Sequence, residues 1–268
     1  MKWLVLVLAF FSASAFSQKV QKEGVEVQKS RLLLLPASTV ENSAAQQYSQ
    51  LMRAAQQKGL LNNDAQQVER LRRIARELIP HATRFNKNAE KWRWEVNLIS
   101  SKTVNAFCMP GGKIAFFTGI LDSLQLTDDE VSTIMGHEIG HALLEHGRAR
   151  MSEQVLKNVG ISVAAAVLNL GQISTEVLAQ AANVAVSLPY ARKHESDADL
   201  VGLELSARSG HDPRAAVAVW QKMTKYAQSA GRGQPPQFLS THPSNDSRIR
   251  DIEASLPKVI PLYRKARP

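Results

Sequence analysis

The sequence predicts a mainly helical α+β protein in which a small β-sheet lies beside one long helix. Three observations support this prediction. Helix start and stop signals recur along most of the 268-residue chain. Alternation of apolar and polar residues, which is typical of strands, appears in residues 92–118. An H-E-x-x-H motif at His137, Glu138 and His141 follows this region, inside a strong helical pattern.

The N-terminus is predicted to be a cleaved secretory signal peptide. Lys2 precedes a short apolar run, and small residues follow it, so residues 1–15 match such a segment. An uncleaved membrane anchor is the alternative, although the run is short for crossing a bilayer. Residues 16–42 are mostly polar and are expected to form an extended lead-in. The remaining residues, 43–268, are predicted to form one domain.

Two helices are predicted before the strands, near residues 43–58 and 64–79. Asp64 is a suitable N-cap for the second helix, because its side chain can accept a hydrogen bond from a free backbone amide. Pro80 ends that helix, since proline cannot continue the backbone hydrogen bonding.

Three strands are predicted next. In the first, four apolar residues alternate with polar ones: Trp92, Trp94, Val96 and Leu98. Two more strands, near residues 104–109 and 113–118, are joined by a turn at Pro110-Gly111-Gly112. Cys108 is the only cysteine and falls in the second strand, so it is expected to be a buried structural thiol.

The H-E-x-x-H motif lies on a helix predicted at about residues 128–149, which a capping box of Thr127 and Glu130 opens. The stretch 155–188 is rich in Ala, Val and Leu, but polar residues interrupt it. It lacks an unbroken apolar span of about 20 residues, so we predict a helical hairpin packed over the core. Contact of this hairpin with a membrane surface is the alternative.

Three further helices are predicted in the last third of the chain. One spans about residues 191–209, and the next begins at Asp212-Pro213, an N-cap followed by a favourable proline. Residues 231–236 are rich in Gly and Pro and are expected to form a flexible loop. Ser244 is expected to cap a final helix that reaches about residue 255.

The H-E-x-x-H residues are candidates for a metal site with a reactive carboxylate. His137 and His141 are one helical turn apart, so their imidazoles project from the same face and can bind one ion. Glu138 lies about 100° further around the helix, beside the ion, where it can accept a proton from water. Two histidines and a carboxylate ligand favour Zn²⁺.

A third protein ligand is needed, and the sequence offers one arrangement and excludes another. A metzincin would have a glycine and a third histidine where this chain has Leu144 and Gly147, so that arrangement fails. His146 is expected to be either exposed or a support for a ligand. Glu195 and Asp199 lie one turn apart on the later helix, so Glu195 can bind the metal while Asp199 orients a ligand histidine.

These motifs together resemble the HtpX / CAAX prenyl protease family of zinc metallopeptidases, particularly its soluble periplasmic BepA-like and LoiP-like members. The resemblance extends beyond H-E-x-x-H and runs from about residue 65 to 256. It includes Asn105-Ala106-Phe107, the segment Pro110 to Ile114, the Glu195 to Asp199 helix, and Ser240-Thr241-His242-Pro243-Ser244 with Arg248.

The resemblance implies a zincin-type catalytic helix and one Zn²⁺ per chain. It implies a periplasmic endopeptidase that cleaves unfolded or misassembled envelope proteins, with Glu138 activating water. His242 and Arg248 are then expected near the metal, where His242 either stabilises the oxyanion or occupies the open zinc position as a latch. Arg248 is expected to bind a substrate carbonyl or the intermediate. Asn105 and Ala106 are expected to offer backbone groups to an extended substrate.

Other functions remain open or are excluded. The formal net charge is +9, but basic residues are scattered among acids without interleaved aromatics, which excludes a nucleic-acid reader. A chaperone-like outer-membrane assembly factor with latent proteolysis is one alternative, and it would contact the assembly machinery or the membrane surface. A zinc exopeptidase is another, although no residue can be assigned to a pocket for a free chain terminus.

Overall fold

The computed structural model describes residues 23–27, 33–159, 191–229, 236–243 and 246–267. Three predictions therefore fall wholly or largely outside the described residues: the signal peptide, most of the hairpin, and the Gly/Pro-rich loop with the Ser244 cap. No helix in the described ranges is both long enough and apolar enough to cross a membrane.

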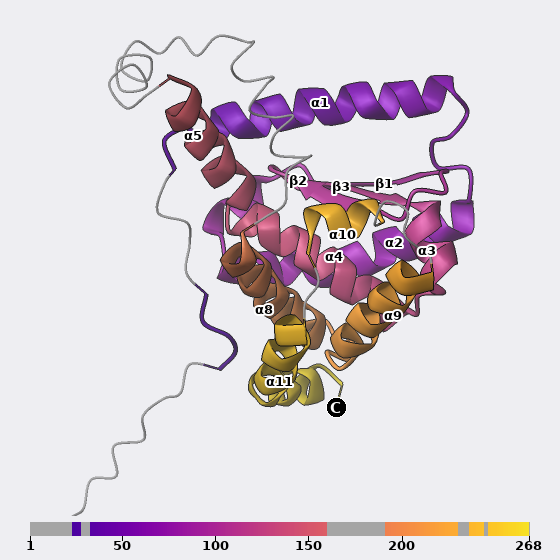
Figure 1. Ribbon diagram of the computed structural model, residues 1–268, viewed down its shortest axis with the longest axis vertical. Coiled ribbons are helices and arrows are strands. Elements are labelled where there is room, and N and C mark those ends of the chain that lie inside the picture. Colours follow the sequence, from indigo (N-terminus) through magenta and orange to yellow (C-terminus); the bar gives the residue numbers. More distant parts are fainter. Residues whose placement is uncertain (1–22, 28–32, 160–190, 230–235, 244–245, 268) are drawn as a thin grey trace, which may run out of the picture.

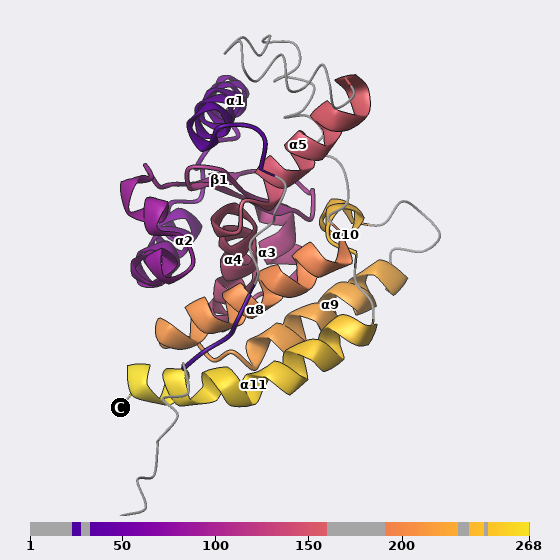
Figure 2. The same ribbon diagram turned by 90° about the vertical axis from the view of Figure 1, so that its left-hand side faces the viewer.

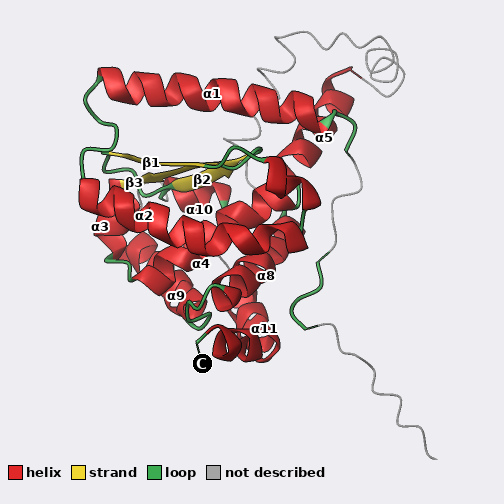
Figure 3. Cartoon of the chain, turned by 180° about the vertical axis from the view of Figure 1, so that it is seen from behind, coloured by secondary structure: helices red, strands yellow, loops and turns green. Residues whose placement is uncertain are grey.

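The predicted fold class is confirmed, because helices make up most of the described chain around one small sheet (Figure 3). The sheet lies between helix α1 (Ala37–Gln57) on one face and helices α2 (Ala65–Leu78) and α4 (Asp128–Leu143) on the other (Figure 1). Tyr48 fixes α1 to the sheet, since its hydroxyl donates a 2.5 Å hydrogen bond to the carbonyl of Ile114.

The sheet has three strands in the order β1-β3-β2. β1 (Glu95–Ile99) is parallel to β3 (Lys113–Phe117), and β2 (Ala106–Met109) is antiparallel to it. The turn between β2 and β3 contains Gly111 and Gly112, both with positive φ, as the predicted turn requires. Because β2 has only one neighbour among the described strands, it is an edge strand, and α4 packs directly beneath it.

Three helices form the other half of the molecule. Helix α8 (Arg192–Arg208) packs against α4, while α9 (Ala215–Ser229) and α11 (Asp246–Ala266) cover α8 and α4 from outside (Figure 2). The shorter elements are α3 (Thr118–Leu124), α5 (His146–Val159), α10 (Gln237–Thr241) and the 3₁₀ helices η1 (Ile79–Arg84) and η2 (Lys87–Lys91).

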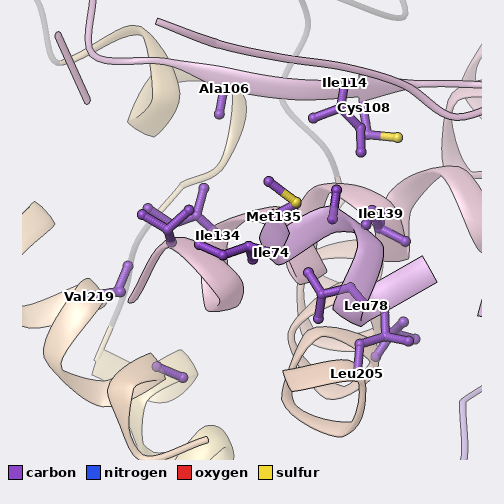
Figure 4. Packing of buried hydrophobic residues seen from close by; sticks show 14 of the residues in the cluster. Ile74, Leu78, Ala106, Cys108, Ile114, Ile134, Met135, Ile139, Leu205 and Val219 are labelled. Atoms are coloured by element: carbon purple, nitrogen blue, oxygen red, sulfur yellow. The ribbon is translucent and has the colours of Figure 1, made fainter. Parts of the chain in front are cut away.

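One apolar cluster joins the sheet to the helices beneath it (Figure 4). It contains Ile74 and Leu78 of α2, Ile134, Met135 and Ile139 of α4, Cys108 and Ile114 of the sheet, Leu205 of α8 and Val219 of α9. Cys108 is buried and free, as predicted. Because α4 is buried along nearly its whole length, the H-E-x-x-H motif is held inside the molecule.

Several element boundaries differ from the prediction. β1 begins at Glu95, so Trp92 and Trp94 lie before the strand. The extended lead-in was predicted to reach residue 42, but α1 begins at Ala37, directly after Pro36. The last helix was predicted to end near residue 255, but α11 continues to Ala266 through Pro257 and Pro261. Burial of Val259 and Leu262 in the main cluster offsets the hydrogen bonds that the two prolines cannot make.

The helix predicted over residues 128–149 is divided in two. It stops after Leu143, because Glu145 adopts a left-handed conformation with φ of 57°, and α5 starts at His146. The break changes the direction of the chain immediately after the second motif histidine. It therefore determines where His146 lies relative to His141.

Candidate active site

Close contact between α4 and α8 brings the two halves of the site together. Gly136, Gly140 and Gly202 lie at this contact, and side chains there would collide with the facing backbone. A Cβ added at Gly202 would lie 2.8 Å from the backbone nitrogen of His137, and one at Gly136 would lie 3.0 Å from the Cα of Gly202. The prediction from the sequence did not include these glycines. Gly136 and Gly140 are four residues apart on α4, and this spacing is a detectable signal.

Four buried side chains converge where the helices meet: His137 and His141 of α4, Glu195 of α8, and His242 directly after α10. One ligand atom from each lies within 4.8 Å of the others. The Nε2 atoms of His137 and His141 are 3.1 Å apart, and His141 Nε2 is 3.4 Å from Glu195 Oε1. The three predicted metal ligands are therefore placed together.

The spacing of these atoms fits a zinc ion. Ligand atoms about 2.0–2.1 Å from zinc at the corners of a tetrahedron are about 3.3 Å apart. The separations include 3.1 Å, between His242 Nδ1 and Glu195 Oε1, and 3.6 Å, between His137 Nε2 and Glu195 Oε2, and one donor atom from each residue lies within 4.8 Å of the others. The donor set of imidazoles and one carboxylate also matches catalytic zinc sites. His242 Nδ1, 3.2 Å from His137 Nε2, is a fourth donor atom beside the three predicted ligands.

Asp199 lies on the outer side of His137, as the sequence predicts. Its Oδ1 is 2.9 Å from Nδ1 of His137, which leaves Nε2 directed at the other ligand atoms. Burial alone lowers the pKa of His137, but the hydrogen bond and charge of Asp199 outweigh it and leave that pKa raised. The arrangement fixes both the ring orientation and the tautomer of the ligand.

Arg248 is near the metal ligands but is not placed to bind substrate. Its guanidinium donates to both oxygens of Asp199 at 2.8 Å and lies 2.7 Å from Oε2 of Glu195. It also stacks on the ring of Trp220, 3.7 Å from the centroid. Arg248 was expected to contact a substrate carbonyl. In the structure its guanidinium instead contacts the carboxylates of Asp199 and Glu195.

The same charges control the ionisation of the two carboxylates. Burial raises the pKa of Asp199, but the charge of Arg248 and the hydrogen bond from His137 hold it below its usual value. Burial also opposes ionisation of Glu195, yet the charge of His242 and hydrogen bonds from His141 and His242 hold its pKa well below normal. Both groups are therefore anionic and suited to hold a cation.

His146 supports the second ligand histidine. Of the two expectations for it, the supporting role is the one observed, because its side chain is fully buried and its Nδ1 is 3.0 Å from Nδ1 of His141. Burial lowers the pKa of His146 to about 2, so this imidazole is neutral. Its ring stacks on His194 at a centroid distance of 4.1 Å. The α4–α5 break makes this contact possible.

Glu138 is buried on the cleft side of the ligands. Its Oε1 has no hydrogen-bond partner in the described part of the chain and lies 3.4 Å from Nε2 of His242. Burial raises the pKa of Glu138, whereas the charges of His242 and His137 act in the opposite direction. A buried carboxylate with a raised pKa beside the metal ligands is suited to accept and return a proton.

The edge strand β2 passes beside Glu138, and its backbone partly meets the expectation for substrate binding. The carbonyl of Asn105 accepts a 3.1 Å hydrogen bond from Phe117 of the neighbouring strand, so it is not offered at the free edge. Alternation in an antiparallel pair then directs the peptide groups of Ala106 and Cys108 outward. The side chain of Asn105 accepts the amide hydrogen of Ala106 at 3.0 Å.

A cleft runs along this edge from the ligands to the start of α1. Its residues come from α1, from β2, from α4 beneath the sheet, and from the start of α5, which rises beside one end of α1 (Figure 1). Those near the reaction centre are Glu138, His141, Thr241 and His242, and those at the far end are Ala37, Val40, Glu41, Trp92, Pro110 and Arg148. The cleft is therefore a partly open passage beside an unpaired strand edge.

Two aromatic residues hold His242 in place, and the prediction from the sequence did not include them. Phe238 stacks on the imidazole of His242 with centroids 4.6 Å apart and an interplanar angle of 29°. The ring centroid of Trp220 lies 6.1 Å from the ring centroids of both Phe238 and His137. The guanidinium of Arg248 stacks on the same Trp220 ring. No local pattern distinguishes these aromatics from ordinary core residues, because their partners are distant in the sequence.

Comparison with known proteins identifies the family. The model of peptidase family M48 matches residues 65–256, the same extent as the resemblance found in the sequence. Mitochondrial metalloendopeptidase OMA1 of Arabidopsis thaliana is 35% identical over 64% of this chain and 34% of its own length. The enzyme of the same name from Schizosaccharomyces pombe is 36% identical over 62% of this chain and 48% of its own length. The chain thus spans between a third and a half of these relatives.

The comparisons contradict the predicted periplasmic location. Metalloprotease LoiP of Escherichia coli is 27% identical over 65% of this chain and 66% of its length, whereas relatives with higher identity are named mitochondrial. The location was deduced from the N-terminal segment and from one branch of the resemblance, and neither is constrained by the residues of the site. The catalytic assignment does not depend on it. The chain belongs to peptidase family M48, whose metalloproteases are zinc-dependent, and it has a buried cluster of His and Glu side chains that could hold a metal ion.

Proposed function

We propose that this enzyme cleaves extended, unfolded segments of proteins within the cleft beside β2. The observation that supports this proposal is the enclosure of an edge strand between α1 and the α4–α5 junction. A folded domain has no free strand to place there. An unfolded segment can add to β2 as a further strand, with most of its binding supplied by the backbone.

In this proposal different residues bind the metal ion and transfer the proton. His137, His141 and Glu195 hold the zinc ion, which when bound lowers the pKa of water and polarises the scissile carbonyl. Glu138 accepts the proton from the attacking water and passes it to the leaving nitrogen. Its raised pKa favours the first transfer, because burial stabilises the protonated carboxyl relative to the carboxylate.

Ala106 and Cys108 position the substrate in this proposal. Their carbonyl groups face the free edge of the sheet, whereas their amides are bonded to the Asn105 side chain and to Glu138, so an antiparallel substrate strand can donate to these carbonyls. Cys108 lies next to Glu138, and a backbone hydrogen bond from Cys108 lowers the pKa of that carboxyl. When the substrate strand pairs with β2, its scissile bond therefore lies beside the general base, Glu138.

In this proposal His242 acts as a latch. Its Nδ1 lies 3.2 Å from Nε2 of His137 and 3.1 Å from Oε1 of Glu195, where it would compete with water for the zinc ion. Opening then requires the segment after α10 to withdraw this imidazole. Nε2 of His242 also lies near Glu138, so after withdrawal the same residue can donate to the developing oxyanion.

The test uses an unfolded reporter protein, with cleavage sites mapped by mass spectrometry. Glu138→Gln should retain zinc but lose about 10²–10⁴-fold in turnover, because the general base is removed. His242→Ala should raise basal cleavage if the latch limits activity, while a loss of about 10²–10³-fold would assign it to the oxyanion alone. Cleavage only at chain ends, with end-blocked peptides resistant, would replace the endopeptidase proposal with an exopeptidase.

A further inference from the structure

We propose that the α1 end of the cleft is a side-chain subsite for a lysine or arginine of the substrate, recognised by Glu41. The inference rests on the proposed cleavage of extended segments and adds a charge preference to it. Three features of this end of the cleft support it: its position relative to the reaction centre, its apolar walls, and the state of the Glu41 carboxylate.

The position of Glu41 is fixed by the turn that follows β2. A Cβ added at Gly111 would lie 3.7 Å from Cβ of Glu41, so Glu41 lies directly over this turn. The cleft is continuous from Glu138 and His242 to Glu41 along β2. A substrate strand advances about 3.4 Å per residue along that edge, so a residue at a fixed number of positions from the scissile bond can direct its side chain to Glu41.

The walls between the reaction centre and Glu41 are mostly apolar. They are formed by Val40 of α1, Trp92, Met109 and Pro110 at the end of β2, and Ala142 of α4. Such walls suit the aliphatic stem of a lysine or arginine, whose charged end must then reach a polar group. A purely apolar side chain would contact these walls but would leave Glu41 without a cation.

The carboxylate of Glu41 has one neutral hydrogen-bond donor and no cation. Its Oε1 accepts a 2.9 Å hydrogen bond from Nε1 of Trp92, which orients it. Among the described residues, Glu41 forms no ion pair. Glu145, the other acid at this end, is 2.7 Å from Arg148, which also donates to the carbonyls of Leu33 and Leu35. The negative charge that remains for a substrate is therefore that of Glu41.

The first test measures binding without turnover. The Glu138→Gln protein, loaded with zinc, is titrated with fluorescent, end-blocked peptides that differ only in lysine, norleucine or glutamate at one position. The lysine peptide should bind about 10- to 100-fold more tightly than the norleucine peptide, as expected for a charge-assisted hydrogen bond. Adding Glu41→Gln should remove this difference while leaving norleucine binding unchanged, because glutamine keeps an acceptor for Trp92.

The second test is a charge reversal with a matched control. Glu41→Lys should bind the glutamate peptide better than the lysine peptide. Glu90→Gln removes an exposed carboxylate that does not line the cleft, and it should leave the preference for lysine intact. Equal affinity for lysine and norleucine at every peptide position, or a lysine preference that survives Glu41→Gln, would overturn the subsite.

Cleavage by the wild-type enzyme separates this inference from the proposed function. Cut sites in a denatured protein mixture should have lysine or arginine enriched at one fixed distance from the scissile bond. Cleavage without that enrichment contradicts the subsite but leaves the endopeptidase intact. Lysine-dependent binding in a protein that cleaves no unfolded substrate contradicts the proposed function and supports the subsite.

Discussion

The two motif histidines have different supports. On the α8 side, His137 is held by a carboxylate, and Asp199 is itself held by two nitrogen atoms of Arg248. On the α5 side, His141 is held by the neutral imidazole of His146. Hydrogen bonds to charged groups are stronger than those between neutral groups, so the two sides differ in strength although both rings are equally buried.

The difference suggests a division of roles between the two sides. The α8 side is a connected set of buried charges that links metal binding to the stability of the helical half. On the α5 side the group that contacts His141 is neutral, and this side adjoins the cleft in which we propose that substrate binds. Mutations on the α8 side should therefore affect folding and zinc together, and mutations on the α5 side should mainly affect zinc.

The largest effect is expected from Arg248→Ala. It leaves two buried carboxylates, Asp199 and Glu195, without their cation, which costs about 3–5 kcal/mol of stability by analogy with other broken buried pairs. Urea unfolding measures this loss. Arg214→Ala is a matched control, because that arginine also pairs with an aspartate, Asp212, but is exposed, and its urea midpoint should be unchanged. Similar losses in both variants would show that the buried network has no special role.

Gly202→Ala should have the next largest effect. The new methyl group would lie 2.8 Å from the backbone nitrogen of His137, so α4 and α8 must separate at a cost of about 1–3 kcal/mol. Gly147→Ala is the control, since its Cβ would meet only Pro110 at 3.9 Å. If α8 is free to shift, the two variants will have the same thermal midpoint, and the close helix contact is then not required for the site.

Asp199→Asn tests the support of the first ligand. The amide can still lie beside His137, but it lacks the charge, so zinc affinity should fall about 10- to 100-fold. Competition with a fluorescent chelator measures the affinity, and circular dichroism checks that the helices remain. Wild-type affinity in this variant would remove the reason for treating the two histidines as different.

The smallest effect is expected from His146→Leu. It removes a neutral hydrogen-bond partner of His141, so zinc affinity should fall by less than about tenfold. His146→Asn places an amide oxygen near the same nitrogen and should restore part of the affinity. A loss larger than that of Asp199→Asn would reverse the proposed order of the two sides.

The sequence predicted the ligands because helical geometry relates residues that are close in the chain. The four-residue spacings of His137 with His141, and of Glu195 with Asp199, already place each pair on one helix face. The sheet was predicted equally well, because alternation and the turn at Gly111 and Gly112 are local signals.

The contacts that could not be predicted are those between distant segments. Arg248 was expected to face substrate, but its partners lie on α8, about fifty residues earlier in the chain. The position of His146 depends on the conformation of Glu145, which no turn motif indicated. The length of α11 depends on burial of Val259 and Leu262, which overrides the local effect of two prolines. In each case tertiary packing decided the outcome.

The enclosure of β2 also bears on the solubility of the protein. A strand with a free edge can pair with the same strand of another molecule, which leads to association of sheets. Here the outward peptide groups of Ala106 and Cys108 lie within a passage bounded by α1 on one side and by the α4–α5 junction on the other. A second folded copy cannot bring its own enclosed edge into register with them. The walls that we propose admit an unfolded chain thus also keep the unpaired edge from serving as a template for aggregation.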